Sequence, residues 1–264
     1  MIEFSEIQNI YWILPVLGFV IGMFGTMVGG GGGFFFIPVL TLLLKVPAQT
    51  AVLTSLMATL PICIAGSWGH SRKGNIDFRN AVNFIEGGII GALLGVLISY
   101  LLSGAQLKVA FGIYSILISI NMVLSKRGKQ IFRDEQAGGT KLFKKAKVYL
   151  FSLFAGMITG TFGTSGTAPV IAGLFSLKMP LKIVIGTSLF IVLFNTLFAV
   201  CIHFLMGTID LTIVFFLTAG SAIGAVIGPK LLSKIRLDQA EKSAGYWYAA
   251  IMVIIGVLMI LGRN

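Results

Sequence analysis

The chain has 264 residues, of which 56% are hydrophobic and only 11% are charged. A soluble domain carries roughly 25% charged residues because its surface faces water, so this composition excludes a soluble domain. The net charge of +11 does not indicate a nucleic-acid partner. The basic residues lie in short connections between apolar stretches rather than on a mixed basic and aromatic face, which is typical of a membrane protein.

The first half of the chain contains five apolar elements. About 20 apolar residues are enough to cross the roughly 30 Å hydrocarbon core of a bilayer. The predicted elements cover residues 10–28, 34–44, 48–69, 80–102 and 105–124. The second element is too short to cross, because eleven helical residues rise only about 16 Å. A run of glycines, Gly29 to Gly33, separates it from the first element.

A basic segment, residues 126–146, divides the chain into a first repeat, 1–125, and a second repeat, 147–264. The second repeat contains five further apolar elements, predicted at 147–162, 168–177, 181–206, 211–232 and 244–262. Its second element is again short, and it follows a break with the sequence Gly-Thr-Ser-Gly-Thr at 163–167. Irregular backbone within a membrane is tolerated only where it is buried in protein or lines a cavity. Both breaks are therefore expected inside the protein.

The two halves match residue by residue, which identifies them as copies of one unit. At a constant spacing, Thr54-Ser55-Leu56 corresponds to Thr187-Ser188-Leu189, His70 to His203, and Ile76-Asp77 to Ile209-Asp210. Chance similarity between apolar helices would match Leu, Ile and Val, and would not align these polar residues together. The sequence predicts an all-α polytopic membrane protein in which each half has about three full transmembrane helices and a glycine-broken hairpin.

The distribution of charge indicates that the two copies are inverted. Cytoplasmic loops carry an excess of Lys and Arg, which places the central basic segment in the cytoplasm. The connection at 70–79 is then cytoplasmic too, whereas its repeat partner at 203–212 has no Lys or Arg and is expected outside. Equivalent loops on opposite faces make an inverted repeat. The alternative is a parallel repeat of four crossings each, which would place the basic connection 230–242 outside. We expect a multi-pass protein of the cytoplasmic (inner) membrane with both termini outside.

The glycine-rich break with Pro38, followed by Pro47 and Thr54-Ser55 and repeated after a central loop, resembles the sulfite exporter TauE/SafE family of membrane transporters. The resemblance covers nearly the whole chain. It implies a secondary transporter that moves a small anion, often sulfur-containing such as sulfite or an organosulfonate, by alternating access. The second break departs from a pure glycine run at residues 164, 165 and 167. An anion or small-solute channel is the alternative, since broken hairpins also build channels.

The two breaks are the predicted substrate site. The first N–H groups of a helix are unpaired within the helix and carry the positive end of its dipole, so short helices beginning at the breaks can bind an anion. Glycine lets the backbone approach a ligand, and nearby hydroxyls complement the amides. The predicted substrate-binding residues are Gly29, Gly30, Gly31, Gly32, Thr54, Ser55, Gly163, Thr164, Ser165, Thr187 and Ser188. A structural role for the hydroxyls stays open, because membrane Ser and Thr often bond the carbonyl four residues back.

Two further polar residues are candidates for coupling or for the transport pathway. Glu86 has no counterpart in the second repeat, and an intramembrane carboxyl is by default a functional candidate, here for a coupling proton. Glu86 is equally consistent with a position at the interface between membrane and water, where it would have no coupling role. Asn195 lies deeper and either faces the pathway or bridges helices. The sequence predicts no enzyme, cofactor or metal site, and its expected partners are the bilayer, a small anion and a coupling proton or cation, with no nucleic acid.

Overall fold

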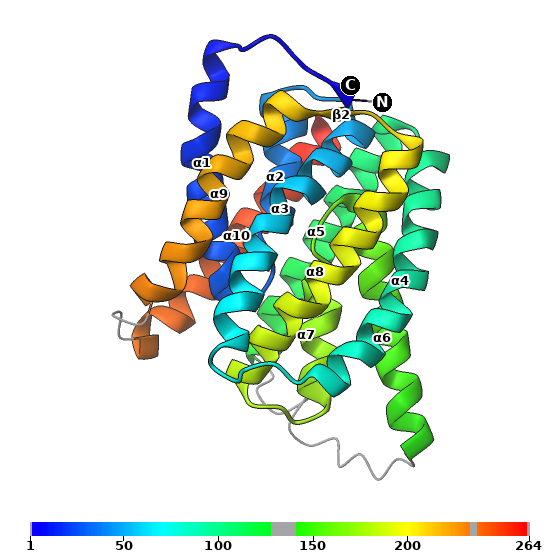
Figure 1. Ribbon diagram of the computed structural model, residues 1–264, viewed down its shortest axis with the longest axis vertical. Helices are drawn as coiled ribbons and strands as arrows, with labels where there is room; N and C mark the ends of the chain where they lie inside the picture. The colour runs from blue at the N-terminus through cyan, green and yellow to red at the C-terminus, as the bar shows by residue number, and fades with distance from the viewer. Residues whose placement is uncertain (1, 128–140, 233–236, 263–264) are drawn as a thin grey trace.

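The computed structural model describes residues 2–127, 141–232 and 237–262, which are almost entirely helical (Figure 1). The first half contains η1 (Asn9–Ile13), α1 (Leu14–Val28), α2 (Gly33–Pro38), η2 (Val39–Leu43), α3 (Ala48–Ser71), α4 (Phe78–Leu101) and α5 (Gly104–Arg127). The second half contains α6 (Lys141–Phe162), α7 (Thr167–Ser176), α8 (Leu181–Met206), α9 (Leu211–Leu232) and α10 (Leu237–Leu261). Two short strands, β1 (Ile2–Glu3) and β2 (Ile209–Asp210), pair in parallel.

Five described segments are long and apolar enough to cross a membrane: Asn9–Met27, Ala48–Ser71, Phe78–Leu101, Gly104–Leu124 and Leu181–Met206. Shorter apolar helices accompany them at Gly33–Leu43, Thr167–Ser176, Leu211–Ile227 and Ala249–Leu261. Large apolar side chains such as Leu101, Leu205 and Phe215 point outward and are more than two-thirds exposed. Such a surface suits lipid, because lipid tails are themselves apolar. The prediction of an all-α polytopic membrane protein is confirmed.

Prolines account for the two places where a predicted element is divided. Pro15 lies in the first turn of α1, where a missing N–H group costs nothing, and the residues before it form the 3₁₀ helix η1 instead. Pro38 lies inside the short helix Gly33–Leu43, which changes there from α-helix to π-helix. A proline inside a helix removes one hydrogen bond of the helical ladder. The start of α6 differs more from its prediction. This helix begins at Lys141, inside the segment predicted as a basic linker.

The two short helices end in the same way. Lys45 follows the first and Lys178 follows the second, and both have the left-handed backbone conformation, with φ of 54° and 58°. Each is followed two residues later by a proline, Pro47 or Pro180, which is the N-cap of the next long helix. A left-handed residue just after a helix is a common helix stop. The repeat seen in the sequence therefore extends to the backbone conformation of these turns.

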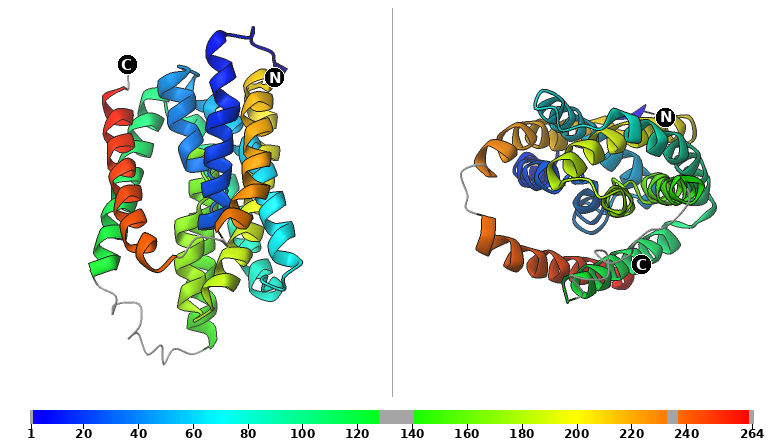
Figure 2. Two further views of the ribbon diagram at one scale, coloured as in Figure 1. Left: turned by 90° about the vertical axis from the view of Figure 1, so that its left-hand side faces the viewer. Right: turned by 90° about the horizontal axis from the view of Figure 1, so that it is seen from below.

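The two halves are packed into each other rather than side by side. The closest helix pairs are α1 with α9, α4 with α6, and α5 with α10, and each pair takes one helix from each half. The central helices α3 and α8 also pack together. Helices at matching positions of the two halves run in opposite directions, as α1 and α6 do in Figure 1. The α5–α10 pair forms a layer beside the rest of the bundle, seen end-on in Figure 2.

Glycines allow these pairs to approach closely. A Cβ atom at Gly91 of α4 would clash with the carbonyl oxygen of Leu153 in α6, and one at Gly22 of α1 would clash with that of Ser221 in α9. At the α5–α10 contact, a Cβ at either Gly112 or Gly256 would lie within 2.7 Å of the other's carbonyl oxygen. Small residues at such contacts are the usual way for membrane helices to pack, because they let the backbones meet.

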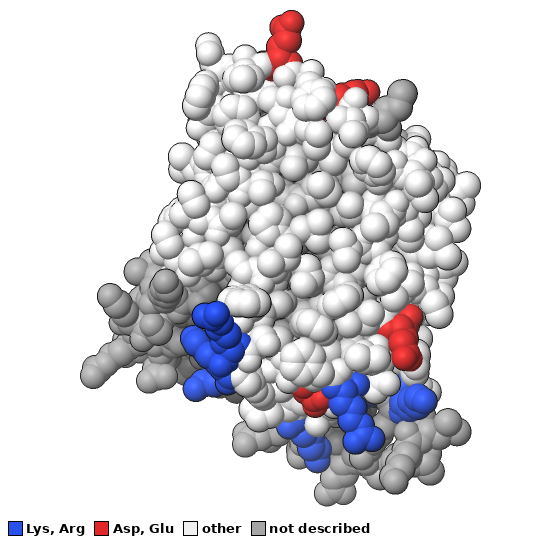
Figure 3. All heavy atoms as spheres, in the orientation of Figure 1, with Lys and Arg blue, Asp and Glu red and all other residues white. Residues whose placement is uncertain are grey.

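Charged side chains are segregated to the two ends of the bundle. On the face shown in Figure 3, Lys and Arg gather at the end away from the N-terminus, where acidic side chains also lie, and only acidic side chains are seen at the N-terminal end. The basic end includes the α3–α4 connection with Arg72 and Lys73. The basic side chains of 230–242, and those of the central segment up to residue 144, lie outside the described part of the chain. By the charge rule for membrane proteins, the basic end is the one expected in the cytoplasm.

Candidate substrate site at the crossing of two breaks

In the structure α2 begins at Gly33 and α7 at Thr167, so the two breaks are residues 29–32 and 163–166. The two breaks and the first residues of these helices lie against each other in the interior of the bundle. A Cβ atom placed on Gly33 would be 3.1 Å from the carbonyl oxygen of Gly163 and 3.3 Å from the amide nitrogen of Ser165. One placed on Gly30 would be 2.9 Å from the hydroxyl oxygen of Thr167. The two segments, far apart in the sequence, are therefore in direct contact through backbone that carries little or no side chain.

The backbone conformation explains why these segments contain glycine. Gly29, Gly31, Gly32, Gly163 and Gly166 all have φ between +52° and +79°. Residues with a Cβ atom rarely adopt this region, whereas glycine does so at no steric cost. The positive φ values turn the chain sharply, so that α2 and α7 begin close to the ends of α1 and α6.

Each break is tied to the central helix of the other repeat by a serine. The Ser55 hydroxyl on α3 lies 2.9 Å from the carbonyl oxygen of Gly163, and 3.1 Å from that of Gly33. The Ser188 hydroxyl on α8 lies 2.9 Å from the carbonyl oxygen of Gly29 and also 2.9 Å from that of Ile185 in its own helix. Both serines are fully buried. Both hydroxyls thus donate to the carbonyl groups that the breaks leave outside any helix, a contact that the sequence did not indicate.

The threonines predicted for the site fall into two groups. The hydroxyls of Thr54 and Thr164 are buried and have no hydrogen-bond partner among the described residues. The hydroxyl of Thr187 instead accepts a bond of 3.0 Å from the backbone N–H of Asp77, at the start of α4. Thr187 therefore holds the α3–α4 connection in place, while Thr54 and Thr164 keep unused hydrogen-bonding capacity. Thr167, the first residue of α7, donates to the hydroxyl of Ser165 in the second break over 2.8 Å.

Asn195 is a buried polar residue of α8 whose whole side-chain amide lacks a hydrogen-bond partner among the described residues. Its side chain is fully buried, and neither its amide nitrogen nor its amide oxygen is hydrogen-bonded within the described ranges. It lies two turns after Ser188 and directly against Gly88 of α4, where a Cβ atom would clash with the amide. Buried polar groups are nearly always paired, so an unpaired amide calls for an explanation.

Glu86 lies away from the breaks. It is exposed on the outer side of α4, and the hydroxyl of Tyr149 on α6 donates to its carboxylate over 2.6 Å. The structure thus brings Glu86 to the surface between α4 and α6. In the described part of the chain, no three or more His, Cys, Asp or Glu side chains lie close enough together to hold a metal ion.

His203 lies in the site region but is not among the substrate-binding residues predicted from the sequence. Its ring is fully buried, and the Nε2 atom donates to the carbonyl oxygen of Gly160 over 2.7 Å. Gly160 lies in the last turn of α6, where carbonyl groups lose their helical partners because the helix ends at the second break. The Nδ1 atom lies 3.4 Å from the hydroxyl of Tyr100. The match of His203 with His70 in the repeat was the signal that could have identified it.

Comparison with known proteins agrees with this architecture. The family model described as "Sulfite exporter TauE/SafE" matches residues 14–259. The chain is 24% identical to the "Probable membrane transporter protein YunE" of Bacillus subtilis (strain 168), over 85% of this chain and 89% of the relative. It is 27% identical to the "Probable membrane transporter protein YdhB" of the same organism, over 84% and 91%. A "Probable membrane transporter protein" of Xylella fastidiosa (strain 9a5c) is 26% identical, over 92% and 91%. No solved structure matches the chain.

Proposed function

Since the chain belongs to the sulfite exporter TauE/SafE family, and is therefore a membrane transporter rather than an enzyme, we propose that it is a secondary transporter of a small anion. The proposed cargo is a sulfur-containing anion such as sulfite or an organosulfonate, carried across the cytoplasmic membrane by alternating access. The observation that carries the proposal is the crossing of the two breaks, with each break bonded to a buried serine of the other repeat.

The crossing offers donors of the kind that an anion requires. Neither Gly32 before α2 nor Gly166 before α7 makes a side-chain capping bond, so the first N–H groups of both helices are not occupied by a cap. Helix starts carry free N–H groups and a partial positive charge. The buried hydroxyls of Thr54 and Thr164 and the amide of Asn195 add donors without a competing partner. In the proposed site these groups replace the hydration shell of the anion, with no buried salt bridge.

The serine bonds support a mechanism in which the breaks separate. In the present arrangement the breaks touch, and the contacts around Gly30 and Gly33 leave no room for a ligand. The Ser55–Gly163 and Ser188–Gly29 bonds each join one of two matched serines to the first residue of the opposite break, and they have the same length. In our proposal, the two repeats are inverted in the membrane, and opening one of these bonds exposes the site to one face. Opening the other bond exposes the site to the opposite face.

The proposal is tested with purified protein. A thermal-shift screen would compare sulfite, thiosulfate, sulfonates, sulfate and carboxylates, since a ligand at 100 times its Kd adds about 2.7 kcal/mol of stability. The best ligand would then be followed into proteoliposomes. Saturable uptake that accelerates when the same anion is preloaded inside supports a carrier. Flux that rises in proportion to concentration without saturating, and shows no such acceleration, would favour a channel and reject alternating access.

A further inference from the structure

His203 is a buried titratable residue to which the proposed function gives no role. It lies in the last turn of α8, at the end of the bundle expected outside, and it is fully buried. Its two ring nitrogens face different helices. The Nε2 atom lies 2.7 Å from the carbonyl oxygen of Gly160 on α6, and the Nδ1 atom lies 3.4 Å from the hydroxyl of Tyr100 on α4. The ring therefore bridges α6 and α4 at the outer end of α8.

The partners of this ring suit both of its protonation states. A carbonyl oxygen only accepts hydrogen bonds, so Nε2 holds a proton toward Gly160 whether the ring is neutral or charged. A tyrosine hydroxyl can donate or accept. The Tyr100 hydroxyl donates to Nδ1 of the neutral ring, and it accepts from Nδ1 of the charged ring while its own hydrogen turns to the carbonyl oxygen of His203, 3.5 Å away. Neither state leaves a ring N–H group without an acceptor.

A protonated His203 would have no carboxylate beside it as a counter-charge, because neither partner of the ring is acidic. Among the helices that pack against α8, α1, α3 and α7 contain no Asp, Glu, Lys or Arg, and the outer parts of α4 and α6, residues 87–101 and 148–162, contain none either. Asp210 is the acidic residue closest to His203 in the sequence. Its carboxylate accepts hydrogen bonds from the backbone N–H groups of Thr212 and Ile213, so it caps the start of α9 instead.

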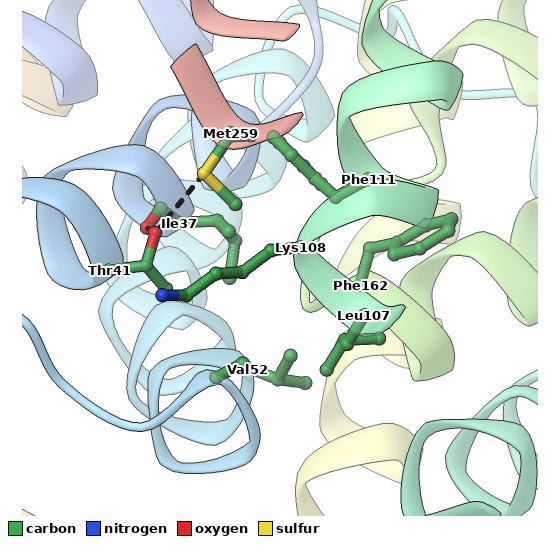
Figure 4. Close-up of a pocket in the computed structure, with 9 residues that line it drawn as sticks. Ile37, Thr41, Val52, Leu107, Lys108, Phe111, Phe162 and Met259 are labelled. Carbon is green, nitrogen blue, oxygen red and sulfur yellow. Dashed lines mark hydrogen bonds between the residues drawn. The ribbon is translucent and has the colours of Figure 1, made fainter. Parts of the chain in front are cut away.

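The cations at this end of the bundle also point elsewhere. Lys108 on α5 extends away from Phe162, which precedes the second break, and toward Thr41 of the first short helix (Figure 4). Its ammonium donates to the carbonyl oxygen of Gly262 over 3.1 Å. Lys45 is exposed. An unbalanced charge in buried surroundings is costly, so a protonated ring favours the arrival of an anion nearby.

The proposed anion site lies close enough to supply that negative charge. Gly160, the acceptor of the Nε2 proton, precedes Gly163, the first residue of the second break, by three residues in the last turn of α6. One helical turn, about 5.4 Å along the helix axis, therefore separates the end of the imidazole bond from the break. Opposite charges at such a distance attract strongly where water is excluded. By reciprocity, a proton that strengthens the binding of an anion is itself bound more tightly when the anion is present.

We propose that His203 binds the coupling proton of transport, and that the proton and the anion bind together. The proton arrives from outside at Nδ1 by way of the hydroxyl of Tyr100. This side chain is half-buried, and its hydroxyl lies against Gly207 in the connection between α8 and α9. The inference rests on the proposed function for the anionic cargo. It goes beyond that function by naming the coupling ion and the residue that binds it.

His70, the matching residue of the first repeat, lacks this arrangement and provides a control. Its Nδ1 atom is buried and has no hydrogen-bond partner in the described structure. The ring packs against Gly186 of α8, where a Cβ atom would lie 3.0 Å from that nitrogen. Protonation at Nδ1 would leave a buried N–H group without an acceptor, which is unfavourable. The proposal therefore assigns the proton to His203 and not to His70.

NMR of the single remaining histidine tests the assignment. The chain has two histidines, so His70→Gln leaves only His203. Protein with isotope-labelled histidine, prepared without a histidine tag, would be titrated with methanesulfonate and then with sulfate at constant pH. Neither anion changes its charge between about pH 5 and 8, the range in which histidine titrates. We expect the ring signals to change from those of neutral imidazole to those of imidazolium as the anion saturates the protein. Saturable binding, measured by thermal shift, without a change in the ring would overturn the coupling.

Transport by His203→Gln provides the second test, because Gln keeps an N–H donor for Gly160 but binds no proton. In proteoliposomes, uptake of methanesulfonate by the wild-type protein should acidify the lumen by about one proton per anion, and an acidic outside should accelerate it severalfold. Any anion flux that His203→Gln retains should carry no protons and should not respond to the pH gradient. His70→Gln should keep both effects.

Proton movement that persists in a folded His203→Gln protein would reject His203 as the proton site. If this variant does not fold, the NMR titration decides, since it needs only His70→Gln. The two levels of the proposal fail differently. Saturable binding and exchange of the anion without any proton movement would reject the coupling alone. No saturable binding or uptake of any anion in the screen would reject the proposed function, and the coupling with it.

Discussion

Ser55, in the first repeat, donates a hydrogen bond of 2.9 Å to the carbonyl oxygen of Gly163, in the second. Ser188 makes the corresponding bond back to Gly29. These hydroxyls, which are predicted to bind the substrate, hold the two breaks against the central helices in the present arrangement. Three predictions concern the breaks and the buried amide near them, and a fourth concerns Glu86, which lies apart from the breaks; each can be measured on the purified protein.

Ser55→Ala should lower the stability of the protein even without an anion. The substitution leaves the Gly163 carbonyl buried without its partner, and such a loss costs about 1–3 kcal/mol. Unfolding in detergent would measure it. Ser99→Ala is the matched control, because Ser99 is equally buried but bonds only the carbonyl of Val96 in its own helix. If both substitutions lower the free energy of unfolding equally, the bond between the repeats contributes no more to stability than a bond within one helix.

Gly163→Ala should disrupt folding far more than Gly74→Ala does. Both glycines have nearly the same left-handed φ, 65° and 66°, so both substitutions carry the same backbone penalty of about 1–2 kcal/mol. A Cβ atom at Gly163 would lie 2.6 Å from the carbonyl oxygen of Val52, whereas one at Gly74 would meet nothing within 4 Å. The yield of monodisperse protein and its melting temperature would separate the backbone penalty, which both variants carry, from the clash, which only Gly163→Ala carries. Equal losses would mean that the close approach at the break is unimportant.

Asn195→Leu should stabilise the protein and abolish transport. An amide buried without partners costs about 1–3 kcal/mol, and an apolar side chain of similar size removes that cost. If the amide binds the anion, saturable uptake should disappear while the melting temperature rises. Thr218→Val is the control, since Thr218 on α9 also has a buried hydroxyl without a partner in the described structure. It should keep transport. Full transport by Asn195→Leu would remove this residue from the site.

Glu86→Gln should leave substrate exchange and gradient-driven uptake unchanged. The carboxylate lies on the outer side of α4 with Tyr149, apart from the breaks, as an interfacial residue would. Uptake by proteoliposomes under an imposed pH gradient would be compared with exchange between equal concentrations of the anion. A selective loss of gradient-driven uptake, with exchange intact, would show that Glu86 carries the coupling proton. Tyr149→Phe would then reveal whether the bond to Tyr149 matters.

Sequence patterns predicted the helices and the location of the breaks because both depend on local properties. Hydrophobic length indicates spanning helices, and glycine indicates backbone that needs positive φ, as at Gly163. The partners of Ser55 and His203 could not be predicted in the same way. Their acceptors, Gly163 and Gly160, lie in distant segments, and the directions of the side chains depend on how the two repeats pack. The start of α6 at Lys141 was also missed, because basic residues were interpreted as a linker although Lys is a good helix former.

The pairing of α1 with α9 sets an order of events during synthesis. The first long helix to leave the ribosome packs most closely against a helix that begins nearly 200 residues later, at Leu211. Until α9 is inserted, the small residues of α1 that meet it, such as Gly22, face lipid or a temporary partner. The first repeat is therefore not a finished folding unit when its last residue is made. The second repeat completes the first, and a nascent chain that stalls at the central segment leaves α1 without its native neighbour.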